Sequence, residues 1–327
     1  MQAWTCRRYG GPDQLRLEEL PVPLPRAGEV LVRIHATTVN SGDVRVRGCD
    51  FPPGMRLMGR LALGWNGPRQ PILGTECAGV VEAVGEGVTR FRPQERVYAF
   101  PGVKMGAHAQ YVIIREDGPI ASLPEGFDFH EASALCFGGT TALHFLRRAG
   151  LKSGESVLVL GGSGAVGLAL VQLAGHQGAT VTATTSTGNL DLVLAHGADR
   201  AVDYTTTDVT TLPDRFDIVA DTADAMDFPT AQKLLAPNGR YLAITGTLKE
   251  MLGSLRLGPE GRLMLAGPAA EKVEDVLELG RLAAAGHYRP HIDRVFPLSD
   301  MPAAHAYVET RRKRGSVVVE MGSPLTA

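Results

Sequence analysis

The sequence predicts an α/β protein with two domains, one rich in short strands and one built on a parallel sheet. Three observations predict this class. The chain has 327 residues, more than a single domain of roughly 100–200 residues would use. Short strand-like segments fill about the first 120 residues, and from about residue 121 helix-like and buried strand-like segments alternate.

In the first region, β-branched segments are separated by Gly and Pro, a pattern typical of an all-β domain. The clearest are EVLVRIHATTV, ECAGVVEAVG, ERVYAF and AQYVII. Residues 51–71 interrupt this pattern, because they mix Gly and Pro with large apolar side chains: Met55, Leu57, Met58, Leu61, Leu63 and Trp65. Two interpretations of this excursion stay open: an apolar lid over a pocket, or a hydrophobic loop packed on its own domain.

In the second region, the short apolar segments SVLVLGG, ATVTATT, FDIVAD and RYLAIT are separated by helix-like segments. This alternation with short connections predicts a parallel sheet covered by helices on both faces. A strand-like RLMLAG follows at residues 262–267. After it come a helix, a strand-like HIDRVFPL, a helix that ends in the basic run RRKR, and a final strand SVVVEM.

Composition excludes several classes of protein. Hydrophobic residues make up 44% and charged residues 21% of the chain, which is ordinary for a soluble globular protein. The net charge of −2 gives no electrostatic basis for binding nucleic acid. No stretch approaches the roughly 18 apolar residues of a membrane helix, and the N-terminus lacks a signal peptide's apolar core, so we expect a cytoplasmic protein with no membrane partner. The four cysteines form no C-x-x-C pair, so neither a disulfide framework nor a cysteine-rich zinc lobe is expected.

One glycine-rich segment carries the strongest functional signal. Gly162, Gly164 and Gly167 form G-x-G-x-x-G between a buried strand and a helix, the context that a dinucleotide-binding turn requires. The first Gly allows the tight turn, the second lets backbone N–H groups approach a pyrophosphate, and the third allows close helix–strand packing. The residues between them, Ser163, Ala165 and Val166, would line the same turn. The alternative is a glycine-rich turn formed for steric reasons alone.

The end of the next strand distinguishes NAD from NADP, because an acidic residue there would hold the ribose 2′-hydroxyl of NAD. Residues 184–189, Thr-Thr-Ser-Thr-Gly-Asn, contain no carboxylate. Thr185, Ser186 and Asn189 can instead donate hydrogen bonds to a 2′-phosphate. We therefore predict NADPH as the cofactor, although no Lys or Arg stands among these residues to strengthen the preference.

Several separated motifs together point to a known family. PILGTECAGVVEAVGEGVTRFRPQERVYAF resembles the G-x-E-x-x-G-x-V element of the medium-chain dehydrogenase/reductase superfamily, and GGTTALHFL resembles its entry into the nucleotide domain. The glycine motif, GADRAVDY and the closing HAYVETRRKRGSVVVEM extend the resemblance over the whole chain. Within the superfamily, the chain resembles the zinc-free quinone oxidoreductase branch.

The resemblance implies an arrangement of the two domains. Residues 1–121 and 268–327 would form a GroES-like catalytic domain, and residues 122–267 an inserted Rossmann domain that binds NADPH. The active site would lie in the cleft between them. The strand-like RLMLAG would pair with a second copy of the chain, which gives a homodimer through the edge of the Rossmann sheet.

Two departures from the zinc-dependent members decide the expected chemistry. Asn40 stands where those enzymes carry a Cys ligand, and Thr75 stands where they carry the His of a G-H-E motif. Glu76 and Asp43 remain, but two carboxylates without nitrogen or sulfur ligands make a poor zinc site, so we expect them to brace the β domain. We predict that the protein holds no metal.

The resemblance also assigns site residues. Asn40 would contact the nicotinamide ribose, its carboxamide or the substrate oxygen, and it is the one residue assigned to catalysis. Thr141 would contact the nicotinamide or the phosphate. Relatives usually carry Gly where this chain has Asp224. The cofactor trough would be lined by Ala223, Thr245 and Gly246, and the 2′-phosphate end by Ser186, Asn189, Tyr204 and Arg311.

Without zinc, formation of an alkoxide from an alcohol is difficult, so the small-molecule acceptor should be electron-poor. We predict hydride transfer from NADPH to a quinone or an α,β-unsaturated carbonyl. The alternatives are an alcohol or aldehyde dehydrogenase, and an NADPH-binding sensor or scaffold without turnover. No general acid is identified among Tyr9, Cys49, His108 and Tyr111, and water can supply the proton. In the basic run Arg311–Arg314, Arg312 and Lys313 are expected to form a solvated helix end, and only Arg311 is assigned a function.

Overall fold

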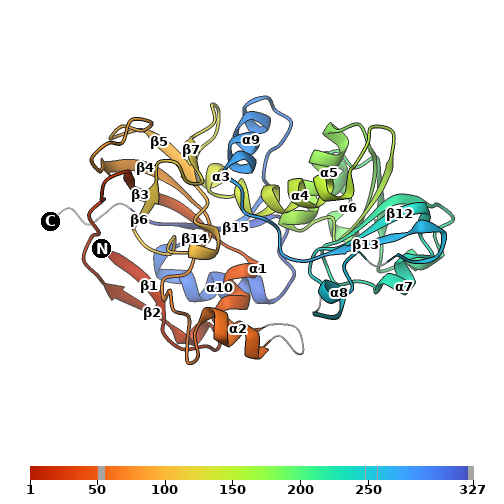
Figure 1. Cartoon of the computed structure of the whole chain (residues 1–327), viewed down its shortest axis with the longest axis horizontal. Helices are drawn as coiled ribbons and strands as arrows, with labels where there is room; N and C mark the ends of the chain where they lie inside the picture. Colours follow the sequence, from red (N-terminus) through yellow and green to blue (C-terminus); the bar gives the residue numbers. More distant parts are fainter. Residues whose placement is uncertain (51–55, 247, 256, 323–327) are drawn as a thin grey trace. The chain divides into compact units, whose positions relative to one another are not determined.

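The computed structural model describes residues 1–50, 56–246, 248–255 and 257–322. The chain folds as two compact units, unit 1 (Met1–Phe137 with Glu271–Ala327) and unit 2 (Gly138–Ala270), as Figure 1 shows in the colours of the sequence. Unit 1 is built from both chain ends, as the expected GroES-like domain requires. Residues 122–137, assigned to the nucleotide domain from the sequence, belong to unit 1, because the helix α3 (Phe129–Ser133) packs on strands of that unit.

Unit 1 is organised around a mixed sheet of seven strands. Their order is β14-β15-β3-β4-β5-β7, and β6 also pairs with β3. The pair β14 and β15 is parallel and the other pairs are antiparallel. The strands are β3 (Glu29–Val39), β4 (Cys77–Val84), β5 (Arg96–Ala99), β6 (Tyr111–Arg115), β7 (Ile120–Ser122), β14 (Ile292–Pro297) and β15 (Ser316–Glu320).

A separate antiparallel pair and several short helices complete this unit. The pair is β1 (Gln2–Cys6) and β2 (Leu15–Glu19). Besides α3, the helices are α1 (Ser41–Gly48), α2 (Arg56–Leu63), α9 (Val273–Ala284) and α10 (Met301–Glu309), with 3-10 turns η1 (Pro12–Gln14), η2 (Gly102–Lys104) and η6 (Leu298–Asp300).

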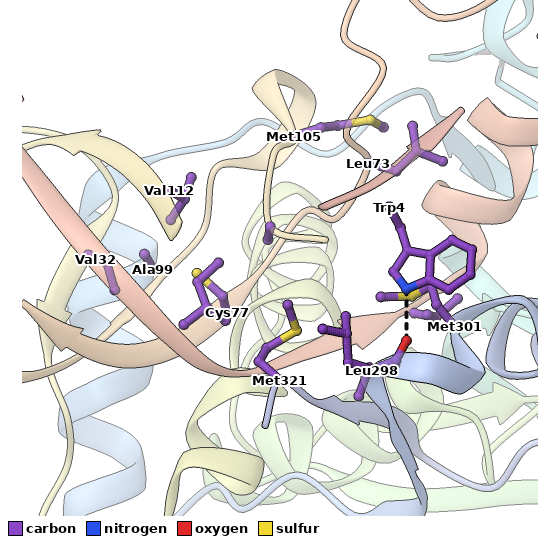
Figure 2. Close-up of a cluster of buried hydrophobic side chains, with 14 of the residues drawn as sticks. Trp4, Val32, Leu73, Cys77, Ala99, Met105, Val112, Leu298, Met301 and Met321 are labelled. Atoms are coloured by element: carbon purple, nitrogen blue, oxygen red, sulfur yellow. Dashed lines mark hydrogen bonds between the residues drawn. The ribbon is translucent and has the colours of Figure 1, made fainter. Parts of the chain in front are cut away.

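The core of unit 1 joins the two chain ends. Figure 2 shows Trp4 from β1, Val32 from β3 and Met301 from α10 within one buried cluster. The indole Nε1 of Trp4 donates a hydrogen bond of 2.7 Å to the carbonyl oxygen of Leu298. Burying an indole requires such a partner for its N–H group, so this contact ties the first strand to the start of α10.

Unit 2 contains a six-stranded parallel sheet with the order β10-β9-β8-β11-β12-β13. Numbered from β8 along the chain, this order is 3-2-1-4-5-6, the order of a doubly wound dinucleotide-binding sheet, whose ligands bind beyond the carboxyl ends of the strands. The strands are β8 (Ser156–Leu160), β9 (Thr180–Thr185), β10 (Arg200–Asp203), β11 (Phe216–Asp221), β12 (Leu235–Ala243) and β13 (Leu263–Ala266).

Helices connect these strands. They are α4 (Cys136–Ala149), which begins at the end of unit 1, α5 (Ala165–His176), α6 (Leu190–Ala195), α7 (Phe228–Ala231) and α8 (Leu248–Leu252), with 3-10 turns η3 (Thr187–Asn189), η4 (Val209–Thr211) and η5 (Pro259–Gly261). The expected α/β class, with a β-rich domain and a parallel sheet, is confirmed.

Candidate functional site

The glycine-rich turn joins the end of β8 to the start of α5, as the motif predicts. A Cβ atom at Gly162 would lie 2.8 Å from the Cβ of Ala183 on β9. A Cβ atom at Gly167 would lie 2.2 Å from the carbonyl oxygen of Gly161. These distances leave no room for a side chain, so both glycines are required for the strand and the helix to pack closely.

Gly164 differs from the other two glycines, because its surroundings are open. A Cβ atom there would meet no atom of the described residues nearer than 3.6 Å, and its φ of −77° suits any residue. Gly164 is the N-cap of α5, a helix of 12 residues, and it has no side chain to occupy the N–H groups of the first turn. Open space in front of a helix N-terminus fits a pyrophosphate, which a side chain at this position would displace.

Polar side chains gather at the carboxyl end of β9, where the 2′-phosphate is expected. The Nδ2 atom of Asn189 lies 3.1 Å from Ser186 Oγ and 3.5 Å from Ser163 Oγ, which links this loop to the glycine turn. The hydroxyl of Thr185 is buried and has no hydrogen-bond partner among the described residues, so a ligand hydroxyl could satisfy it. The backbone N–H of Tyr204 donates to the carbonyl of Thr185, and the Tyr204 side chain is exposed.

A carboxylate that the sequence analysis missed lies beside this loop. Asp203 ends β10, and the parallel register pairs it with Thr185. Its two oxygens accept hydrogen bonds of 2.6 Å from the hydroxyls of Thr187 and Thr205, and these bonds lower the pKa of the carboxyl. The expectation of no carboxylate holds within residues 184–189 but not for the neighbouring strand. Its position beside this loop follows from the pairing of β10 with β9, which the sequence pattern does not show.

The loops after β11 and β12 hold the residues expected to line the cofactor trough. Asp221 accepts backbone N–H groups from Ala223, Ala225 and Met226, which fixes the loop that follows β11. Asp224 in this loop has a φ of +57°, the left-handed region that favours glycine, which agrees with the Gly expected there in relatives.

Three predicted residues lie near this carboxyl edge of unit 2. Thr245 and Gly246 follow β12, and β12 neighbours β11 in the parallel sheet. A Cβ atom at Gly138 would lie 2.7 Å from the carbonyl oxygen of Ala165, so the start of α4 touches the start of α5. Thr141 lies three residues after Gly138 on α4. Their contacts with a cofactor stay predictions.

In unit 1, Asn40 is fixed by hydrogen bonds on both sides of its amide. Its Oδ1 atom caps α1 by accepting the backbone N–H of Gly42 at 2.9 Å and that of Asp43 at 3.3 Å. Its Nδ2 atom donates to the hydroxyl of Thr75 at 2.7 Å. An amide nitrogen carries two hydrogens, so one N–H of Asn40 is left for a bound molecule.

The buried carboxylate of Asp43 holds the backbone next to this pair. Asp43 accepts the backbone N–H of Asn40 at 2.9 Å and that of Gly74 at 3.1 Å, and burial raises its pKa to about 7. It therefore fixes the chain on both sides of the Asn40–Thr75 hydrogen bond. This is the bracing role expected for Asp43.

Glu76 joins the sheet to the start of α4. Its Oε1 atom accepts the hydroxyl of Thr38 at 2.6 Å, and its Oε2 atom accepts the backbone N–H groups of Cys136 at 3.0 Å and Phe137 at 2.7 Å. Burial raises the pKa of Glu76 to about 7, and the nearby Asp43 carboxyl acts in the same direction. All three bonds favour the charged form, but they do not outweigh the loss of solvation.

Within the described ranges, no group of three or more His, Cys, Asp or Glu side chains is arranged to hold a metal ion. The four cysteines, all within the described ranges, are buried and form no disulfide bonds. The chemistry of the donor set is also wrong for zinc, because an amide, a hydroxyl and two backbone-bonded carboxylates replace thiolate and imidazole.

Two of the four polar groups considered as proton donors, Tyr9 and His108, have structural hydrogen-bond partners. The Tyr9 hydroxyl donates to the carbonyl of Gly64 at 2.7 Å, and Cys49 is buried at the end of α1. His108 Nε2 lies 2.9 Å from the carbonyl of Thr38, and burial lowers the pKa of this imidazole to about 4. Tyr111 is half-buried on β6.

Arg311 is exposed in unit 1, after α10, with a φ of +57°, and its contact with a 2′-phosphate stays a prediction.

Part of the excursion at residues 51–71 is helical. Leu57, Leu61 and Trp65 are spaced by four residues and are 57–59% exposed, whereas Leu63 is half-buried. Met55 lies outside the described residues, and so does the side chain of Met58. Three exposed apolar side chains argue against a loop packed on its own domain, and the lid remains a prediction.

Among the described residues, no helix combines the length and apolar character needed to cross a membrane.

Two family models match the chain. Residues 26–125 match the alcohol dehydrogenase GroES-like domain, and residues 196–319 match the zinc-binding dehydrogenase family.

Individual relatives agree with these models. The chain is 34% identical to a 2-methylene-furan-3-one reductase of Solanum lycopersicum and 32% identical to a chloroplastic NADPH-dependent alkenal/one oxidoreductase of Arabidopsis thaliana, in each case over 98% of this chain and 79% of the relative. The solved quinone oxidoreductase of Coxiella burnetii superposes with a TM-score of 0.82 at 26% identity, over 98% of this chain and 99% of that one. The chain therefore belongs to the medium-chain dehydrogenase/reductase superfamily, as an oxidoreductase of its quinone oxidoreductase-like branch.

Proposed function

We propose that this protein reduces a quinone or an α,β-unsaturated carbonyl compound with NADPH and without zinc. The hydrogen bond of 2.7 Å between Asn40 and Thr75 carries the proposal. These two residues stand where zinc-dependent members carry zinc ligands, and here their side chains bind each other. Without a Lewis acid to polarise an ordinary carbonyl, the acceptor must itself be electron-poor. The names of the relatives described above, an alkenal/one oxidoreductase and a quinone oxidoreductase, support this class of acceptor.

A bound NADPH would supply the hydride, and the chain would supply orientation. The open space at Gly164 and the first turn of α5 fit its pyrophosphate. The remaining N–H of Asn40 and the hydroxyl proton of Thr75 are donors for the nicotinamide carboxamide or the acceptor oxygen. Because α1 and Asp43 fix these groups beforehand, little order is lost when the acceptor binds.

The preference for NADPH over NADH rests on Ser186, Asn189 and Thr185, which offer donors to a 2′-phosphate. Asp203 opposes this preference for NADPH, because its negative charge lies on the neighbouring strand and would repel a 2′-phosphate. Since both of its oxygens are already hydrogen-bonded to Thr187 and Thr205, we propose that NADPH is still preferred.

We also propose a homodimer in which a second copy meets the β13 side of unit 2. The outer edge of β13 is partly covered, since Leu255 donates to Met264 and Gly258 donates to Arg262. Leu252, Leu255 and Leu257 are 66–80% exposed beside it. Exposed apolar groups at a sheet edge favour pairing with another chain. A cytoplasmic location stays a prediction.

Steady-state turnover of the purified protein tests the function. NADPH and NADH are each mixed with a quinone, an enone, an enal and a simple alcohol–aldehyde pair, and oxidation of the cofactor is followed by absorbance. We expect saturable turnover with at least one electron-poor acceptor, unchanged after dialysis against a chelator. Turnover confined to the alcohol–aldehyde pair, with one zinc per chain by elemental analysis, would indicate an alcohol dehydrogenase. NADPH binding with no turnover would indicate a sensor or scaffold.

A further inference from the structure

The amine of Lys313 is turned into unit 1, although its neighbours in the basic run are exposed. Arg311 and Arg312 are exposed, whereas Lys313 is half-buried and its Nζ atom donates a hydrogen bond of 2.7 Å to the carbonyl oxygen of Gly315. The solvated helix end expected from the sequence is therefore wrong for Lys313. An ammonium has three N–H donors, and Gly315 accepts one of them.

The register of the sheet places Lys313 at the edge that carries Asn40. Val317 on β15 pairs with Val39 on β3, so the start of β15 lies beside the end of β3, where Asn40 follows. Cys77 on β4 pairs with Thr37 on β3, so Thr75 and Glu76 lie at the same edge. Lys313 precedes β15 by three residues, and it is close enough to Glu76 for the carboxylate to influence its pKa.

The other ionisable groups at this edge are poorly suited to give up a proton. Glu76 accepts three hydrogen bonds and Asp43 accepts two, and these bonds favour the ionised forms of both carboxyls. Both side chains are also buried away from the solvent that would restore a lost proton. His108 is fully buried, and its Nε2–H is directed at the carbonyl of Thr38. Asp293, on the neighbouring β14, accepts the Tyr307 hydroxyl and the backbone N–H of Arg314.

We propose that Lys313 is the proton donor of the reduction, delivering a proton to the acceptor after hydride transfer. This inference rests on the proposed function. It concerns a lysine at this edge that holds several protons and is half-buried, so that part of its side chain stays in solvent.

The bonds that form and break balance. An α,β-unsaturated carbonyl gains hydride at its β-carbon, and the electron pair of its C=C bond moves to give an enolate. One N–H bond of the Lys313 ammonium then breaks and a C–H bond forms at the α-carbon, which leaves a saturated ketone or aldehyde and a neutral amine. Water returns a proton to that amine.

The environment of Lys313 suits this role. Burial lowers its pKa to about 8, while the negative charges of Asp293 and Glu76 oppose the shift. A general acid is most effective when its pKa lies near the working pH, because it is then protonated and still a sufficiently strong acid. An ordinary lysine, with a pKa near 10.4, would be a much weaker proton donor.

Three variants separate proton donation from charge. Lys313→Arg keeps a positive charge but cannot release a proton in this pH range. Lys313→Met removes both the charge and the proton donor. Arg312→Met is the matched control at an exposed neighbour. General acid catalysis contributes typically 10²–10⁴-fold, so we expect kcat with an enone to fall by about 10² in Lys313→Arg and Lys313→Met. The Kd for NADPH of Lys313→Arg and the kcat of Arg312→Met should match those of the wild type.

A readout on the free protein is independent of turnover. Competitive acetylation at a series of pH values, with quantification by peptide mass spectrometry, should show that Lys313 titrates near pH 8. With an enone, wild-type kcat should fall as the pH rises above about 8, because the donor loses its proton, and Lys313→Arg should lack this decline.

The outcomes are distinguishable from a failure of the proposed function. If the wild type reduces no quinone, enone or enal, the proposed function fails. If the wild type reduces an enone and Lys313→Arg retains its kcat, the function stands and the assignment of Lys313 is overturned. Labelling of Lys313 with the pH dependence of an ordinary surface lysine would likewise overturn it.

Discussion

The side-chain amide of Asn40 donates a hydrogen bond of 2.7 Å to the hydroxyl of Thr75, while its oxygen caps the first turn of α1. The amide is therefore held at both ends and cannot rotate to exchange its donor and acceptor. Its second N–H is the group that can serve a ligand, so its direction is set by the backbone of α1 and by Thr75. One residue thus stabilises a helix and presents a donor.

Substitution of Asn40 can separate these two roles. Asn40→Ser keeps an oxygen that can cap α1, so the free energy of unfolding should change by only a few tenths of a kcal/mol, whereas Asn40→Ala should lose about 1 kcal/mol. Both variants lack the amide N–H, and loss of a hydrogen bond to the acceptor should lower kcat/KM by roughly tenfold in both. Urea unfolding and steady-state kinetics measure the two effects. Wild-type kcat/KM in Asn40→Ser would show that the amide contacts neither cofactor nor acceptor.

Two glycine substitutions should fail for different reasons. Gly164→Ala has room for its Cβ and a suitable φ, so its melting temperature should stay near that of the wild type, but the methyl group enters the space expected for the pyrophosphate. Its Kd for NADPH, measured by fluorescence titration, should rise at least tenfold. Gly167→Ala places a Cβ 2.2 Å from the carbonyl oxygen of Gly161, so it should be destabilised by more than about 2 kcal/mol. Equal NADPH affinity in Gly164→Ala and the wild type would exclude this turn as the phosphate site.

The glycine motif could be predicted from the sequence because its constraints are local. Strand, turn and helix are adjacent in the chain, and the close contacts that require Gly162 and Gly167 lie within the turn or on the neighbouring strand. The substitution of zinc ligands by Asn40 and Thr75 was also visible, since the family places ligands at fixed positions in its motifs.

Asp203 and Lys313 could not be predicted in the same way. Asp203 reaches the loop after β9 only because β10 pairs with β9 in parallel register. Lys313 stands in a run of basic residues that is ordinarily solvated, and only the bond from its Nζ atom to Gly315 shows that the amine turns inward. Both depend on strand register and side-chain direction, which a pattern of residue types does not encode. The boundary near residue 137 also depends on packing, since α3 packs on the strands of unit 1.

A carboxylate introduced at Ser186 should change cofactor preference. Ser186→Asp would place a negative charge beside Asn189, where a 2′-phosphate is expected, so the KM for NADPH should rise by at least tenfold while that for NADH changes little. Asp203→Asn is the complementary variant and should improve NADPH binding, because it removes the nearest charge on the adjoining strand. Parallel changes for the two cofactors would place the 2′-phosphate elsewhere.

The proposed dimer makes a prediction about one exposed leucine. Leu257→Asp puts a charge on the apolar surface beside β13 and should convert a dimer to a monomer in sedimentation velocity. Leu24→Asp is the matched control, because Leu24 is also exposed but lies in unit 1. Dissociation by Leu24→Asp alone, or a wild type that is already monomeric at micromolar concentration, would contradict this interface.

The buried carboxylate of Glu76 should make stability depend on pH in an identifiable window. Its pKa is raised to about 7 in the folded chain by burial, against an ordinary value near 4.5, so folding favours the protonated form. This stabilisation of the folded state by the protonated carboxyl is fully present below about pH 4.5 and is lost as the pH rises through about 7.

The variant Glu76→Gln is uncharged at every pH. The unfolding free energy of the wild type minus that of the variant should therefore fall by an amount on the order of 3 kcal/mol between about pH 4.5 and about pH 7. Urea unfolding at several pH values measures this difference. The exposed Glu125→Gln is the control for replacing a carboxyl by an amide at the surface. A constant difference for Glu76→Gln would mean that the three hydrogen bonds from Thr38, Cys136 and Phe137 keep the carboxylate charged despite its burial.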